Sequence, residues 1–236
     1  SGYRTGPAPD WVRHVEPDLS LPVPEDASGG VHYLLTDMQL RHEPGREATY
    51  ARFATRVVDA SGLGDVANIE IGFDPSFQTL TLHAVDVIRD GRRIPRLEGA
   101  QVELLQRERE LEARIFDGRM TAAIFLPDVR VGDVVDYAFS TKGANPVFKG
   151  AAFGGVYTQW SVPVAHDHTR LLLAPGRSVQ VQSRHGAPEA RLSRLADGYQ
   201  EYVWEQRGIP GETPDAGAPG WHDARPQVQW SQYRDW

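Results

Sequence analysis

The segment Gln78-Thr-Leu-Thr-Leu-His-Ala-Val-Asp-Val-Ile88 decides the fold class of this chain. Apolar and polar side chains alternate along it, which is the period-2 pattern of a strand with one buried face formed by Leu80, Leu82 and Ala84. The dipeptide Asp90-Gly91 comes next, and it favours the positive φ values of a tight hairpin turn. We therefore expect Arg92-Arg-Ile-Pro95 to return as a short antiparallel partner strand.

Segments of the same kind fill most of the chain after residue 31. They are rich in β-branched and aromatic residues and are separated by glycine, proline and aspartate. The further predicted strands cover residues 31–40, 48–58, 120–126, 134–140, 156–163, 169–173, 178–182 and 199–206. Because each sheet must bury its apolar side, about a dozen short strands predict an all-β fold of antiparallel sheets packed face to face, as one or two β-sandwiches.

The charged segment from Glu103 to Arg114 leaves two interpretations open. Glutamate and arginine stand four residues apart at Glu103/Arg107 and again at Glu110/Arg114, a spacing that supports a solvated helix. A strand followed by a loop fits the same residues.

Proline and glycine mark the expected domain boundaries. Residues 1–30 contain five prolines, whose fixed φ and missing N–H predict an extended arm. Residues 31–207 are predicted to form the β-sandwich domain, with a possible internal boundary in the glycine-rich segment 150–155. Residues 208–236 resemble a linker toward a following domain, and its contact residues are expected to be Trp221, Trp230, Tyr233 and Trp236. The alternative is that these aromatic side chains fold back onto the β domain.

Composition excludes several classes of function. The formal net charge is −7, so phosphate backbones and anionic lipid surfaces would on average repel the chain, and nucleic acid is not an expected partner. The chain has no cysteine, which excludes disulfides, thiolate metal sites and a thiol nucleophile within these residues. No apolar run is long enough to span a bilayer, and the given N-terminus carries no export signal.

The best candidate for metal chemistry is His166-Asp167-His168, because residues i and i+2 of a strand share a face and two imidazoles there could hold a divalent ion. A third ligand is not evident; His185 and His222-Asp223 qualify only if the fold brings them close. The competing interpretation is a solvated strand end. No cofactor is predicted, since Gly62-Leu-Gly64 lacks the third glycine of a dinucleotide site, and no Gly-x-Ser-x-Gly motif occurs.

Four tryptophans suggest a second binding chemistry, a stacking platform for sugar rings. They are Trp11, Trp160, Trp204 and Trp221. Core packing explains Trp160 and Trp204 better, which leaves Trp11 and Trp221 as the candidates for an exposed platform.

Three segments in order give the chain a family resemblance. They are Phe73-Asp-Pro-Ser-Phe-Gln-Thr-Leu-Thr-Leu-His-Ala-Val-Asp-Val-Ile-Arg-Asp-Gly91, Leu126-Pro-Asp-Val-Arg-Val-Gly-Asp-Val-Val-Asp-Tyr137 and Gln159-Trp-Ser-Val-Pro163. With them the chain resembles, roughly from Val31 to Trp236, the N-terminal domain of bacterial transglutaminase-like proteins (domain of unknown function 3857 family).

The resemblance implies an all-β module in front of a papain-like transglutaminase domain, whose Cys-His-Asp triad performs acyl transfer or peptide hydrolysis. None of that triad is expected in this chain, which is therefore predicted to be non-catalytic and to position or regulate the downstream domain or help recruit its substrate. The resemblance also implies export, to the periplasm or cell envelope. An alternative function is a β-sandwich module that binds cell-envelope carbohydrate or peptide.

Overall fold

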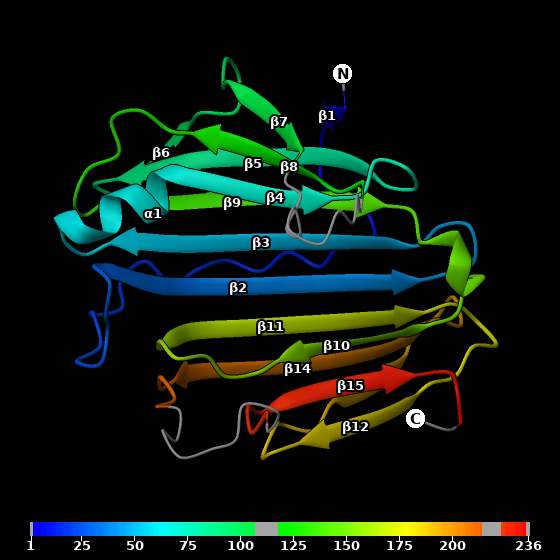
Figure 1. The fold of residues 1–236 in the computed structure, drawn as a ribbon. Helices are drawn as coiled ribbons and strands as arrows, with labels where there is room; N and C mark the ends of the chain where they lie inside the picture. Colours follow the sequence, from blue (N-terminus) through cyan, green and yellow to red (C-terminus); the bar gives the residue numbers. More distant parts are fainter. Residues whose placement is uncertain (1, 107–117, 214–222, 235–236) are drawn as a thin grey trace.

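A nine-stranded sheet forms the centre of the computed structural model, which describes residues 2–106, 118–213 and 223–234 (Figure 1). Its strands are β1 (Tyr3–Thr5), β2 (Val31–His42), β3 (Ala48–Val57), β5 (Thr79–Arg89), β6 (Arg92–Pro95), β9 (Val134–Lys142), β11 (Val164–Leu173), β13 (Arg191–Arg194) and β14 (Gln200–Ile209). They are ordered β1-β5-β9-β3-β2-β11-β14-β13, and β6 also pairs with β5.

Two three-stranded antiparallel sheets cover one face of the large sheet (Figure 1). One contains β4 (Asn68–Phe73), β8 (Met120–Phe125) and β7 (Val102–Gln106); the other contains β10 (Phe153–Tyr157), β15 (Gln227–Ser231) and β12 (Gln180–Arg184). Within the described ranges, the helical elements are α1 (Leu63–Ala67) and two single 3₁₀ turns, Ala60–Gly62 and Pro146–Phe148. The predicted all-β sandwich is confirmed, as two small sandwiches that share one large sheet.

The large sheet is mixed, not purely antiparallel as expected. β1 pairs with β5 and β2 pairs with β11 in parallel, while its other pairings are antiparallel. The β2–β11 pairing joins strands from both sides of the glycine-rich segment 150–155, so the large sheet runs on across this point.

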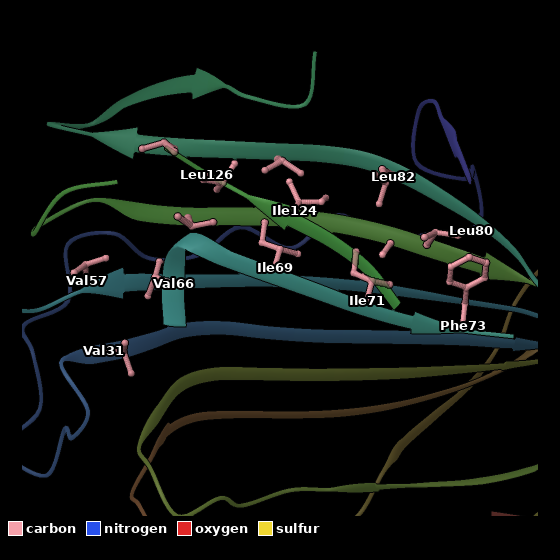
Figure 2. Close-up of a cluster of buried hydrophobic side chains, with 14 residues drawn as sticks. Val31, Val57, Val66, Ile69, Ile71, Phe73, Leu80, Leu82, Ile124 and Leu126 are labelled. Atoms are coloured by element: carbon pink, nitrogen blue, oxygen red, sulfur yellow. The ribbon is translucent and has the colours of Figure 1, made fainter. Parts of the chain in front are cut away.

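The first core lies between the β4-β8-β7 sheet and the β5-β9-β3 part of the large sheet (Figure 2). Alternate residues of β4 are buried, and Ile69, Ile71 and Phe73 all point into this core. Strand β5 supplies the opposing side chains. Burial of apolar surface stabilises such a pair of sheets by roughly 25 cal/mol per Å².

The strand-and-turn prediction for residues 78–95 is confirmed, with one correction. Asp90 and Gly91 have φ values of 51° and 73°, and β5 pairs with β6 across this turn. However, the register with β9 shifts between Leu82 and Ala84, so Val85 and Val87 occupy the buried face in place of Ala84. A β-bulge of this kind inserts one extra residue and reverses the facing of the later residues of the strand.

The second core lies between the β10-β15-β12 sheet and strands β11 and β14. Trp204 and Trp230 stack in it with ring centroids 5.9 Å apart, against Leu171 and Leu173. Gly154 is required at this point, because a Cβ on it would meet the Trp230 ring at 2.7 Å.

This second core corrects part of the predicted C-terminal linker. Residues 227–231 form strand β15, and Trp230 is only 1% exposed, so its ring packs inside this domain and is not available to another one. Tyr233 is 51% exposed. Trp221 and Trp236 lie outside the described residues.

One strand prediction also shifts, and the open choice for the charged segment is partly decided. The predicted strand 156–163 is displaced, since β10 ends at Tyr157. Of the charged segment 103–114, the part up to Gln106 belongs to strand β7 and the rest, with Arg107, Glu110 and Arg114, lies outside the described residues.

Candidate functional site

The proline-rich arm crosses the face of the large sheet opposite the two small sheets. Its extended backbone leaves carbonyl groups free, and arginines of the sheet donate to them: Arg52 Nη1 to Val15 O (2.8 Å), Arg56 Nη2 to Leu19 O (2.8 Å) and Arg170 Nη1 to Trp11 O (2.5 Å). Gln39 exchanges two further bonds with the backbone of Arg13. The arm is therefore extended as predicted, and side chains far away in sequence hold it in place.

The covered face buries charge that is paired within the sheet. Arg52 makes a bidentate contact with Asp136, at 3.0 Å from Nε to Oδ1 and 2.8 Å from Nη2 to Oδ2. Arg170 Nε donates to Glu201 Oε2 at 2.6 Å. Burial of charge is tolerated when such partners are present. These ion pairs hold in position two of the arginines that donate to the arm.

The predicted histidine pair lies on this same face, in the middle of β11. His168 Nδ1 donates to Asp37 Oδ1 at 2.7 Å. Among the described residues, both ring nitrogens of His166 lack a hydrogen-bond partner, and Nε2 lies 3.7 Å from Glu205. Both rings are buried, so the alternative of a solvated strand end is wrong. Across the described ranges, no three His, Cys, Asp or Glu side chains gather into a possible metal site.

Of the other proposed ligands, His185 and Asp223 do not join the pair. His185 lies in the turn after β12, where its φ is 56°. Asp223 binds Arg225 and the hydroxyl of Tyr157 instead. His222 lies outside the described residues.

A cavity of about 680 Å³ opens between the first part of the arm and the sheet. Its floor comes from β2, β3, β5, β9 and β11, and its walls from the arm and from the turn before β14. The lining includes four cations, Arg41, Arg46, Lys142 and Arg170, and two carboxylates, Asp10 and Asp197. The lining side chains thus carry more positive than negative charge, in a chain whose net charge is −7, and Glu43 and Glu201 beside them offset part of it.

Arg41 is the most unusual of these cations. Its side chain is 9% exposed, its guanidinium lies 5.2 Å from the centre of the Trp11 ring, and its Nε donates to Arg46 O at 2.9 Å. Among the described residues its two terminal nitrogens have no hydrogen-bond acceptor. Burial, and next the neighbouring Arg46 cation, lower the pKa of Arg41, while Glu43 acts in the opposite direction.

His83 closes the cavity on the β5 side. Its Nδ1 lies 2.9 Å from Gly6 O, a pure acceptor, so Nδ1 carries the proton and Nε2 accepts from Ser140 Oγ at 2.9 Å. Burial lowers the pKa of His83, which keeps this neutral form at pH 7. The ring therefore ties the arm to the sheet.

The sequence did not reveal this cavity, and Trp11 is the one lining residue that it offered as a candidate for binding. Trp11 was singled out as a platform for sugars, but its ring covers Arg41. A usable signal does exist in β2, where Asp37, Gln39 and Arg41 stand at every second position of a strand and so share one face. Such alternation groups these polar side chains on one face of the strand, although it does not tell a covered face from a solvated one.

A second surface feature lies on the β10-β15 sheet. Phe148 and Phe153 pack edge to face at 4.8 Å and are 45% and 39% exposed. Together with Tyr233 they line a shallow groove of about 490 Å³. We call these three residues the aromatic groove.

The family described as Domain of Unknown Function with solved-structure structure (DUF3857) matches residues 43–212. The chain belongs to this family. No curated protein matches the chain.

Two solved structures are similar to this chain. A Parabacteroides distasonis protein described as a "putative protease" is similar with a TM-score of 0.75 and 17% identity, over 88% of this chain and 41% of that protein. An M1 zinc metallopeptidase from Deinococcus radiodurans has a TM-score of 0.41 and 12% identity, over 87% of this chain and 43% of that protein. The chain spans less than half of either protein. The first likeness establishes the fold alone, and the second carries no argument.

Proposed function

We propose that this chain is a non-catalytic β domain that precedes a transglutaminase-like catalytic domain in the same polypeptide. It positions or regulates that domain or helps recruit its substrate. The observation that supports this is coverage: the fold fills 88% of this chain but 41% of the Parabacteroides protein, which carries a larger remainder beside it. A chain without cysteine has no thiolate nucleophile, which assigns acyl-transfer chemistry to the partner domain.

The aromatic groove is the surface we assign to this partner domain. Its three rings are between 39% and 51% exposed, and aromatic side chains are enriched at the centres of protein interfaces. Tyr233, one of the residues predicted from the sequence to contact the next domain, lines it. The next domain of the polypeptide would therefore meet this one close to β15.

Export to the periplasm or cell envelope belongs to the same proposal, and it is supported by the family resemblance. No helix in the described parts of the chain has the length and apolar character needed to cross a bilayer.

The test is a calorimetric titration of this chain into the separately expressed remainder of the polypeptide. We expect saturable binding that Phe153→Ser or Tyr233→Ser weakens about tenfold or more, because each removes a ring from the contact. The matched control is Phe125→Ser, since Phe125 is 61% exposed on the other small sheet and lies outside the groove. The control should bind like the unmodified chain.

Two results together would refute the accessory role. One is the absence of any binding heat while both partners are folded. The other is full activity of the polypeptide after deletion of residues 1–236.

A further inference from the structure

We propose that the cavity beneath the arm binds a small organic carboxylate, with Arg41 as its anchor. This inference concerns the opposite side of the large sheet from the aromatic groove, so it stands independently of the accessory role proposed above. It rests on the geometry of Arg41, on the second cation at the cavity and on the cavity walls.

The guanidinium of Arg41 is held in place, and its terminal nitrogens have no acceptor among the described residues. Nε is fixed by the Arg46 carbonyl, and the Trp11 ring covers one face of the group. The nearest carboxylate, Glu43, stands 4.0 Å from Nε and is already engaged by the Tyr199 hydroxyl and by Arg46. The two terminal nitrogens form the fork that matches a carboxylate in bidentate geometry.

Lys142 adds a second positive charge at the same cavity. It ends β9, its side chain is exposed, and within the described part of the chain its ammonium forms no ion pair or hydrogen bond. Arg170 also lines the cavity, but its charge is offset by Glu201. Arg46, a further cation of the lining, is 60% exposed and pairs through Nη1 with Glu43. Arg41 and Lys142 are therefore the lining cations that we assign to an anion.

The cavity walls restrict the ligand further. Pro7, Pro9, Leu172 and Leu195 supply apolar surface beside the Trp11 ring, which suits a ligand with an organic body. Asp10 and Asp197 place two negative charges at the lining, and these disfavour a multiply charged anion. The volume of about 680 Å³ falls within the range usual for small-molecule sites.

The experiment is a calorimetric titration of the intact chain with three probes: an N-acetylated dipeptide with a free carboxylate, the same dipeptide as its C-terminal amide, and inorganic phosphate. We expect saturable binding of the free-carboxylate dipeptide and binding of the other two probes that is weaker by about tenfold or more. The amide cannot form the charge-assisted bidentate contact with the guanidinium, and the second negative charge of phosphate is repelled by the two aspartates. Arg41→Gln should lower the affinity for the free-carboxylate dipeptide about tenfold, and Lys142→Gln should lower it about fivefold.

Lys149 provides the matched control, because the chain has two lysines and Lys149 lies outside the cavity lining. Lys149→Gln should leave the affinity unchanged. Lys142→Gln keeps the test valid if Arg41→Gln weakens the fold, because Lys142 has no structural partner among the described residues. A second readout is acetylation by a lysine reagent, with the dipeptide expected to protect Lys142 and not Lys149.

Three results would overturn the proposal. They are equal binding of the amide, phosphate binding as tight as the carboxylate, and no saturable binding of the carboxylate by a chain whose unfolding curve is normal.

Discussion

The two faces of the nine-stranded sheet are buried by different means. Under the small sheets, apolar side chains such as Phe73 and Trp230 fill two cores, and the stabilisation grows with the area removed from water. Under the arm, the buried groups include Arg52, Asp136 and Glu201, and a buried ion pair adds little net stability although breaking one is costly. A smaller apolar cluster lies beside them, where Val15 and Leu19 of the arm pack on buried side chains such as Ile88 and Val134. The comparison indicates that the first face, with the two larger apolar cores, supplies most of the stability, while the ion pairs of the second fix the path of the arm and shape a polar cavity.

The largest expected effect tests the apolar face. Trp230→Ala removes a ring that is 1% exposed and stacked on Trp204, so the free energy of unfolding should fall by about 4 kcal/mol. Urea unfolding measures this. Tyr233→Ala, three residues away but half-exposed, should cost less than about 0.5 kcal/mol. Similar costs for both variants would contradict the assignment of Trp230 to the core.

A second prediction concerns Asp167, a carboxyl on the sandwich side of β11 that has a threonine hydroxyl (Thr36) and no cation as partner. Burial raises the pKa of Asp167 to about 7, from 3.8, so stability present below pH 4 is lost as the pH rises through 7. Asp167→Asn should therefore stabilise the chain at pH 8 by up to about 3 kcal/mol and match it near pH 4. Unfolding free energies measured at both pH values check this, and a constant difference would contradict it.

The third prediction tests the arm face. Asp136→Asn removes the charge that faces Arg52 and Arg93, whose Nη1 lies 2.9 Å from Asp136 Oδ2. Because an amide oxygen can still accept a hydrogen bond, the expected cost is about 2 kcal/mol by urea unfolding. Limited proteolysis should also cut the arm sooner. An arm cleaved at the unmodified rate would show that this pair does not hold it.

The smallest expected effect concerns His42, which accepts a hydrogen bond from Trp230 Nε1 at 3.2 Å. Burial, and next the Arg177 charge, lower the pKa of His42 to about 4, from 6.5. Its contribution is thus fully present above pH 6.5 and is lost as the pH falls through 4. His42→Asn keeps an acceptor but cannot titrate, so its loss of stability between pH 6.5 and 4 should be about 1–2 kcal/mol smaller. An unchanged pH profile would contradict this.

The candidate site was less predictable than the strands. His166 and His168 were correctly placed on one strand, but the partner of His168 is Asp37, 131 residues away, and no local pattern reveals that contact. The same holds for Arg41, whose cavity needs the arm, β5 and β9 as well. A covered polar face looks in sequence like a solvated one, because both place polar residues at alternate positions.

The sequence by itself determined the all-β class, the hairpin at Asp90-Gly91, the extended arm and the family. Alternation, turn chemistry and proline content act within about ten residues, so a single segment carries each of them. Only the tertiary structure decided that β2 pairs with β11 in parallel, that Trp230 points inward and that the arm encloses a cationic cavity. These features depend on which distant segments meet, and that choice is made by the burial of whole faces and not by the residues of any one strand.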